Sequence, residues 1–431
     1  MSSSERERRK KQIKICKKIE KIFPKCSDNK KIKCYNISIC PKSNRKEWKN
    51  MDFKNLENFM DKITAWRIPG AECEVYLENK RVFRYTSGYA DVDKKTPIDG
   101  SKYFLYSVTK PATAAAVMQL VERGEILLCN PVKEYLPEFS EMYVKREIEP
   151  GKFELKKAEH DITIKHLLSM SAGLDYNWNT PAIQSVKAAS GGVSPTREIV
   201  RAIAQSPLWF EPGEHWQYSL CLDVLGGLVE AVSGMKFGEY VKKNIFEPIG
   251  MENSTFRFTE EIASQMASQY QFDEELGQYK KIDFINPHSN GIGSEYDSGG
   301  AGIISTVEDY AKFASALANG GVAPNGSRIL SSGAVELMRT NMLSAEALKD
   351  VTWESIYGYG YGAAVRTMID RTKCSSIGSV GEFGWGGAAG AYLMADPEKK
   401  LSVFYAQHML NSQEPYVHPR LRNIVYSSIE Y

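Results

Sequence analysis

The 431-residue sequence lacks several features that define common protein classes. No apolar run approaches the ~18 residues of a membrane-spanning helix, and no apolar stretch follows the first ten residues as in a secretory signal. No Gly-x-Ser-x-Gly motif occurs, which argues against a Ser-His-Asp hydrolase, and the six histidines form no metal-binding cluster. We therefore expect no cofactor and no metal. The eight cysteines are interpreted as reduced thiols of a cytoplasmic protein.

Charge is unevenly distributed along the chain. Residues 1–50 carry 17 basic and 5 acidic side chains, whereas the other 381 residues carry 38 and 48. A mildly acidic body argues against nucleic-acid binding. Residues 1–50 are therefore predicted to be a basic, flexible extension. Its isoleucines have helical spacing, which leaves open a basic amphipathic helix with weak contact to a membrane surface.

Strand patterns occur at both ends of the body. Residues 71–78 alternate apolar and polar side chains and are followed by a turn and a second strand over 81–88. Three more strands are predicted near the C-terminus, before a helix from about Pro419. We expect one five-stranded antiparallel sheet, built from both termini and flanked by helices. The three C-terminal strands are predicted at 383–387, 391–395 and 401–406.

The middle of the chain has a different pattern. Helical spacing recurs at 162–169, 196–205 and 222–233, separated by loops rich in glycine and proline. We therefore predict an α/β sheet domain of residues 51–130 and 300–431, interrupted by a mainly helical domain of residues 131–299.

The motif Ser-x-x-Lys carries information only through its context. It occurs four times, twice in the lysine-rich residues 1–50 and once across Gly234, which has the pattern of a helix C-cap. Only one copy follows an extended aromatic run and opens a helical pattern, over 111–122. The four copies begin at Ser27, Ser43, Ser107 and Ser233.

At Ser107 the spacing suits covalent catalysis. Residues i and i+3 share one face of a helix, so the Lys110 amine can reach the Ser107 hydroxyl. A serine hydroxyl is a poor nucleophile until a neighbouring base takes its proton. The unpaired N–H groups of the helix end can stabilise an oxyanion. Taken alone, the motif is more often an N-capping serine followed by a solvated lysine.

Two further segments become relevant once Ser107 is a candidate nucleophile. Tyr218 follows a turn at Pro212-Gly213 and precedes a helical pattern, where it can relay protons. Residues 385–388 (WGGA) have a strand pattern, and two glycines there allow close approach of a substrate to the backbone. Ordinary packing explains each segment equally well when it is taken alone.

With these motifs in order, the sequence resembles the serine β-lactamase and penicillin-binding-protein superfamily. The resemblance covers about residues 52–429 and is closest to the class C-like branch with the family VIII carboxylesterases. It implies a β-lactamase/transpeptidase-like fold. Besides Ser107-Val108-Thr109-Lys110, the matching motifs are 162–174 (ITIKHLLSMSAGL), 211–219 (EPGEHWQYS), 246–251 (FEPIGM), 299–306 (GGAGIIST) and 385–387 (WGG).

The resemblance also implies roles for individual residues. Ser107 would be the nucleophile that forms an acyl-enzyme, and Lys110 the partner that shuttles its proton. Tyr218 would act as general base or acid. Trp385, Gly386 and Gly387 occupy the place of a Lys-Thr-Gly motif, so the N–H groups of Ala388 and Ser107 would form the oxyanion hole.

Two departures from the family pattern bear on the substrate. Leu220 stands where β-lactamases have an asparagine that contacts the substrate amide, and Trp385 replaces a lysine that receives the substrate carboxylate. The resulting cleft is expected to be more apolar, which suits a neutral ester better than an anionic antibiotic. Trp178, Trp209 and Trp216 either line an acyl pocket or are buried structural aromatics.

We therefore predict a serine hydrolase that cleaves small esters, with a small-molecule ester or amide as its partner. Within the superfamily the alternatives are a β-lactamase, a D-amino-acid peptidase and an acyltransferase. Outside this class, a catalytically inactive binding or scaffold protein is the competing hypothesis, because a fold does not determine a function. The sequence makes no prediction of the oligomeric state.

Overall fold

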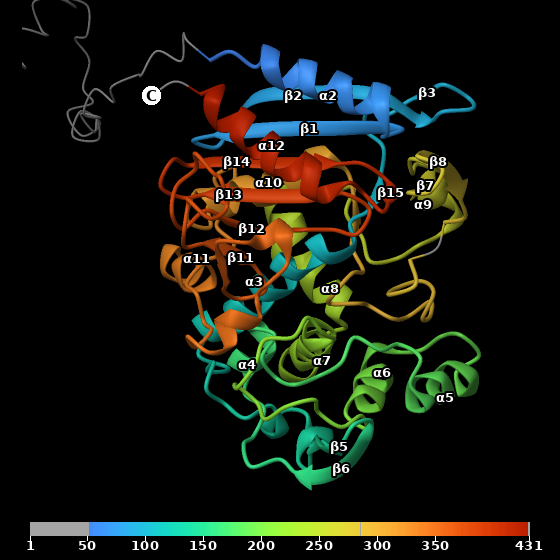
Figure 1. Ribbon diagram of the computed structural model, residues 1–431, viewed down its shortest axis with the longest axis vertical. Helices are drawn as coiled ribbons and strands as arrows, with labels where there is room; N and C mark the ends of the chain where they lie inside the picture. Colours follow the sequence, from blue (N-terminus) through green and yellow to red (C-terminus); the bar gives the residue numbers. More distant parts are fainter. Residues whose placement is uncertain (1–50, 285, 430–431) are drawn as a thin grey trace, which may run out of the picture. The chain divides into compact units, whose positions relative to one another are not determined.

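An eight-stranded antiparallel sheet joins segments from both ends of the body (Figure 1). The computed structural model describes residues 51–284 and 286–429, so the predicted basic extension of residues 1–50 lies outside the described residues. The strand order is β10-β11-β12-β13-β14-β1-β2-β3. The strands are β1 (Gly70–Leu77), β2 (Lys80–Asp91), β3 (Thr96–Pro97), β10 (Tyr359–Tyr361), β11 (Arg366–Met368), β12 (Phe383–Gly386), β13 (Tyr392–Asp396) and β14 (Leu401–Ala406).

The predicted fold class is confirmed. The five strands expected from the sequence are β12, β13, β14, β1 and β2, and they are neighbours in the sheet in this order. Strand β1 is central, with Val75 opposite Val403 of β14 on one side and Phe83 of β2 on the other. The three unpredicted strands lie at the sheet edges and have only two or three residues each, too few for a pattern of period two.

Helices cover the sheet. α2 (Lys54–Trp66) packs on α12 (Glu414–Ser427) and on β2, while α10 (Val307–Ala318) packs on β1, β13 and β14. α12 begins five residues before the predicted start at Pro419, which is a correction. Pro415 occupies its first turn, where no N–H is needed, and the helix continues through Pro419 despite the missing donor.

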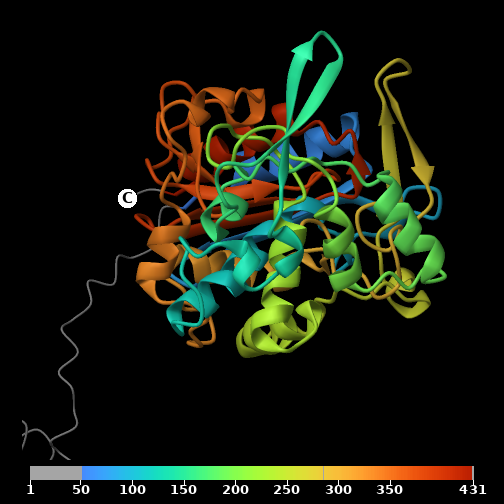
Figure 2. The ribbon, with the colours of Figure 1, turned by 90° about the horizontal axis from the view of Figure 1, so that it is seen from below.

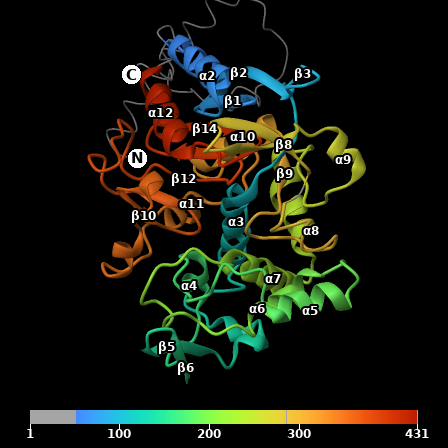
Figure 3. The ribbon, with the colours of Figure 1, turned by 45° about the vertical axis from the view of Figure 1, so that its right-hand side comes forward.

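Between β4 and α10 more residues lie in helices than in strands (Figure 3). As predicted, α7 ends at Gly234, whose φ of 69° is left-handed. Two projecting hairpins, β5–β6 and β7–β8, were not predicted (Figure 2). The helices are α3 (Thr109–Glu122), α4 (Ile164–Leu168), α5 (Pro181–Ala189), α6 (Thr196–Ile203), α7 (Cys221–Ser233), α8 (Phe237–Val241) and α9 (Glu260–Ser264). The hairpin strands are β5 (Tyr143–Glu149), β6 (Lys152–Lys157), β7 (Gln269–Asp273) and β8 (Gln278–Ile282).

The chain from residue 51 onward forms one compact unit by its contacts. Its division at residues 130/131 and 299/300 stays a prediction. None of the helices in the described part of the chain is both long and apolar enough to cross a membrane.

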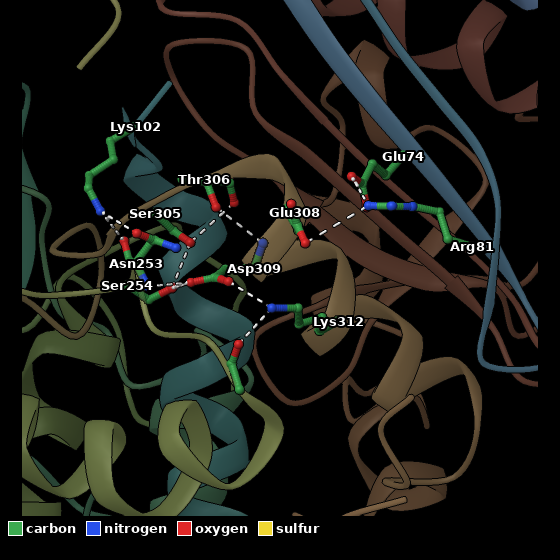
Figure 4. A network of polar contacts seen from close by, with 11 residues as sticks. Glu74, Arg81, Lys102, Asn253, Ser254, Ser305, Thr306, Glu308, Asp309 and Lys312 are labelled. Carbon is green, nitrogen blue, oxygen red and sulfur yellow. Dashed lines mark hydrogen bonds and ion pairs between the residues drawn. The ribbon is translucent and has the colours of Figure 1, made fainter. Parts of the chain in front are cut away.

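A polar network ties α10 to the strand that leads to Ser107 (Figure 4). Lys102, directly before β4 (Tyr103–Phe104), donates from Nζ to the carbonyl of Asn253 at 3.1 Å and to its Oδ1 at 3.2 Å. The backbone N–H of Asn253 donates to Asp309 Oδ2 at 2.6 Å, and Lys312 Nζ to Asp309 Oδ1 at 3.0 Å. The buried Asp309 carboxylate is thereby paired with Lys312, whereas the buried Lys102 ammonium is bonded by oxygen atoms of Asn253.

A buried carboxylic acid lies beside β4. Glu72 is 2% exposed, and it accepts hydrogen bonds from Tyr103 Oη at 2.6 Å and from the backbone N–H of Gly100 at 3.1 Å. Burial raises the pKa of Glu72 to about 7, because the hydrogen bonds from Tyr103 and Gly100 and the charge of Arg84 offset the lost hydration of the carboxylate only in part.

This raised pKa predicts a pH-dependent stability. Between about pH 4.5 and pH 7, folded Glu72 keeps a proton that the unfolded chain has lost, so the free energy of unfolding falls as the pH rises. The loss is at most about 3 kcal/mol. In Glu72→Gln we expect a flatter dependence and higher stability at pH 8, measured by urea denaturation from pH 4.5 to 8. The exposed Glu78→Gln serves as the control, and equal slopes in both variants would contradict this assignment.

Candidate active site

A tight turn places Ser107 at the start of α3. The chain leaves β4, passes through the short 3₁₀ turn Tyr106–Val108 and continues into α3 at Thr109. Tyr106 has a φ of 49°, a left-handed conformation that non-glycine residues rarely adopt. Its hydroxyl accepts a hydrogen bond from Gln269 Nε2 at 2.6 Å, which helps to hold the turn. The Ser107 side chain is half-buried and faces a pocket.

Lys110 lies one helical turn after Ser107, as its spacing predicts. Its side chain is fully buried, and its Nζ donates to Ser107 Oγ at 3.1 Å and to the Gly300 carbonyl at 2.8 Å. The same Nζ lies 4.5 Å from the centre of the Tyr218 ring, a cation–π distance. The structure thus brings the three candidate catalytic residues together.

Tyr218 is held by Trp385. The two rings stack with centroids 5.7 Å apart and 22° between their planes, and Trp385 Nε1 donates to Tyr218 Oη at 3.2 Å. The indole therefore directs one hydrogen bond to the phenol oxygen. This contact gives Trp385 a positioning role in addition to its place in the pocket wall.

The glycines after Trp385 allow two backbone segments to approach closely. A Cβ on Gly387 would lie 2.2 Å from the Leu105 carbonyl oxygen, so only glycine fits there. This approach brings the end of β12 against the Ser107 turn. Ser107 and Ala388 both line the pocket, as an oxyanion hole made from their N–H groups requires.

The pocket has an aromatic wall and a polar far end. Tyr218, Trp353 and Trp385 form the wall, where Trp353 lies edge-on to Tyr218 with centroids 5.0 Å apart. Arg366 of β11 and Glu414 of α12 lie at the far end, so the expectation of a more apolar cleft is met only at the wall. The remaining lining residues are Ser355, Ile356, Gly386, Gly387, Tyr392, His418, Pro419 and Arg422.

Leu220 and three tryptophans are not in this lining. Leu220 is 3% exposed and packs in the core at the start of α7, so its substrate contact is not supported. Trp178 packs on His288, and Trp209 contacts Phe153 of the projecting hairpin. Trp216 lies behind the wall, edge-on to Trp353. The lining tryptophans are Trp353 and Trp385.

Sequence reasoning missed Tyr176 in the site. Its ring stacks on Tyr218 at 5.4 Å, lies 5.7 Å from Lys110 Nζ, and its hydroxyl is hydrogen-bonded with Ser107. Burial raises the pKa of Tyr176 well above its usual value, which favours a neutral phenol. Its position two residues after the 162–174 motif was the one available signal.

Asp223 was also missed, although it organises the far side of Lys110. This fully buried carboxylate accepts from Tyr296 Oη at 2.6 Å, Ser298 Oγ at 2.7 Å and the Gly300 N–H at 3.3 Å. Gly300 in turn offers its carbonyl to Lys110. Burial raises the pKa of Asp223, while these hydrogen bonds and the charge of Lys110 oppose the rise.

The fold is that of β-lactamase/transpeptidase-like proteins. The chain belongs to the beta-lactamase family, whose model matches residues 54–426. Esterase EstB of Burkholderia gladioli is 30% identical over 357 residues, covering 78% of this chain and 85% of that protein. Acyltransferase calJ of Penicillium decumbens is 26% identical over 344 residues, covering 74% and 77%.

A solved structure shows the same fold. EstCE1, described as a hydrolase with promiscuous acyltransferase activity, matches with a TM-score of 0.68 and 24% identity. The match covers 86% of this chain and 98% of EstCE1. The chain is thus a member of a family of serine hydrolases and acyltransferases.

The Asp223 network predicts an indirect effect on Ser107. Asp223→Asn keeps the shape but removes the charge that orients the Ser298–Gly300 loop, so Lys110 should lose its fixed position. We expect the rate of Ser107 labelling by a fluorophosphonate to fall at least about tenfold. Glu230→Gln, at the opposite end of α7, is the matched control. Labelling of Asp223→Asn at the unmodified rate would exclude this role.

Proposed function

We propose that this chain is a serine carboxylesterase that works through an acyl-enzyme on Ser107. The observation that supports it most directly is the 3.1 Å contact between Lys110 Nζ and Ser107 Oγ inside a pocket-lining turn. A scaffold protein would have no need for a fully buried lysine next to a half-buried serine, because burying a charge is costly.

The proposed reaction has two halves. In the reactive form Tyr218 is a phenolate, and Lys110 relays the single proton of Ser107 to it as Ser107 Oγ attacks the ester carbonyl. The negative charge that develops on the carbonyl oxygen is stabilised by the N–H groups of Ser107 and Ala388. The proton then passes to the departing alcohol, which leaves the acyl group on Ser107. A water molecule then gives a proton to Tyr218 and attacks the acyl carbon. The bond to Ser107 Oγ breaks, the proton returns to that oxygen, and the acid is released.

Esters are favoured over β-lactams by the residue at position 385. Trp385 places a stacked indole in the wall where the family pattern has a lysine, so no ammonium is available there for a substrate carboxylate. The 30% identity to an esterase agrees with this choice. β-Lactam or D-amino-acid peptide cleavage remains the alternative outcome of the test below.

Acyl transfer is a second candidate function, supported by the relationship to an acyltransferase. Trp353 is 41% exposed at the mouth of the pocket, and such a ring offers an apolar surface to an acceptor alcohol. Both functions share the acyl-enzyme and differ in whether water or an alcohol takes the acyl group. Added alcohols would divert the product from acid to ester only in the second case.

Ser107→Ala tests the proposal. We expect the unmodified chain to react with a fluorophosphonate probe and to hydrolyse short p-nitrophenyl esters faster than a chromogenic cephalosporin. Ser107→Ala should lose both the labelling and the hydrolysis, because among the residues that the structure describes no other hydroxyl accepts a hydrogen bond from Lys110.

Ser233→Ala is the matched control, since Ser233 belongs to another Ser-x-x-Lys motif of the same chain. It should react like the unmodified protein. Labelling that persists in Ser107→Ala would remove this residue from the mechanism, and the absence of all labelling would favour a scaffold. Faster cephalosporin turnover would reverse the choice of substrate.

A further inference from the structure

Glu414 is a charged group of the pocket that the proposed reaction does not use. It is the first residue of α12, its side chain is 32% exposed, and it lines the pocket onto which Ser107 opens. Its Oε1 lies 3.4 Å from the position that a Cβ on Gly386 would occupy. The carboxylate therefore lies beside the backbone that carries the oxyanion site.

Within the described residues, Glu414 has no basic partner that balances its charge. The one group within ion-pair distance is His418, whose Nδ1 is 3.9 Å away. Burial lowers the pKa of His418 to about 3, so this imidazole is neutral at physiological pH. Ser355 forms an uncharged hydrogen bond with Glu414, and Arg366 attracts Glu414 electrostatically without contacting it. Burial accordingly raises the pKa of Glu414.

The arginines of the same pocket are buried and engaged by the protein, except for Arg422 Nε, which has no hydrogen-bond partner among the described residues. Arg366 pairs with the fully buried Glu382 at 3.0 Å and donates to Tyr392 Oη at 2.8 Å. Arg422 donates to Tyr359 Oη and to the carbonyl of Cys374. Both guanidinium side chains belong to residues that are 3% exposed. Glu414 is therefore the most accessible charge that a ligand meets at the far end of the pocket.

Aromatic faces lie next to this carboxylate. Trp353 and Trp385 have centroids 6.3 Å apart with 43° between their planes, and Ser355, two residues after Trp353, bonds Glu414. Aromatic faces attract organic cations through their quadrupole, and a nearby carboxylate adds a direct Coulomb attraction. A cation bound there would also offset the lost hydration of Glu414.

We infer that the pocket accepts esters carrying an organic cation, held between the Glu414 carboxylate and the faces of Trp353 and Trp385. This inference rests on the proposed ester hydrolysis and names a class of substrate for it. Esters of quaternary or primary amino alcohols have the required chemistry. Neutral esters of the same shape lack the charge, and anionic esters are repelled.

An isosteric pair of esters tests the inference. Butyrylcholine and 3,3-dimethylbutyl butyrate have the same shape, but only the first carries a positive charge. We expect kcat/KM to be about tenfold higher for butyrylcholine, a preference typical of one charge-assisted contact. In Glu414→Gln the ratio should fall towards one, and in Glu414→Asp, which keeps the charge, part of it should return.

Glu354→Gln is the matched control, because this exposed glutamate lies next to Ser355 but outside the lining. It should keep the ratio of the unmodified chain. Any of three outcomes would overturn the inference but not the proposed ester hydrolysis. These are a ratio at or below one, an unchanged ratio in Glu414→Gln, and a preference for monobutyl succinate over both esters. Hydrolysis of none of these esters would overturn the inference and the ester-cleaving function together.

Discussion

The site depends on one buried ammonium group. Lys110 has no exposed surface, so the hydration that a lysine normally keeps must be replaced by protein groups. The Gly300 carbonyl, the Ser107 hydroxyl and the Tyr218 ring supply that replacement from three separate segments of the chain. The carboxylate of Asp223 orients the first of them. Each of these contacts also fixes the position of the segment that makes it. The contacts that stabilise the charge of Lys110 therefore also assemble the site.

The sheet supplies the second constraint, which is steric. The end of β12 approaches the turn before α3 so closely that Gly387 has no room for a side chain beside the Leu105 carbonyl. The same strand carries Trp385, which stacks on Tyr218. The strand leads directly into Gly387 and Ala388, so one short segment brings the proposed oxyanion donor and the support of the phenol to Ser107. Small displacements of such groups are costly for catalysis, and the pairing of β12 with β11 and β13 limits them.

Elements whose formation depends on residues close together in the sequence could be predicted from the sequence. The five expected strands of the main sheet and α3 followed from periodicity and turn residues, and the pairing of Ser107 with Lys110 followed from helical spacing. The hairpin strands β5 and β6 are as long but were not predicted. The edge strands β10 and β11 are too short for any period, and the start of α12 was hidden by two prolines. Tyr176, Asp223 and Glu414 reach the site through tertiary packing, where spacing along the chain carries no information. Trp178, Trp209 and Trp216 were candidates for the pocket but do not line it. The presence of a tryptophan in the sequence does not show whether its side chain lines a pocket or packs in the core.

The order of strands in the sheet has a consequence for biosynthesis. β1 is among the first folded segments to be made, yet its neighbour β14 is among the last. Its edge stays without that partner while most of the polypeptide is translated, and such long-range pairing is slow. The helix bearing Ser107 leaves the ribosome well before Trp385 and Gly387 do. A chain released early would therefore contain the proposed nucleophile without its proposed oxyanion donor, and the unpaired edge of β1 would make it prone to aggregation.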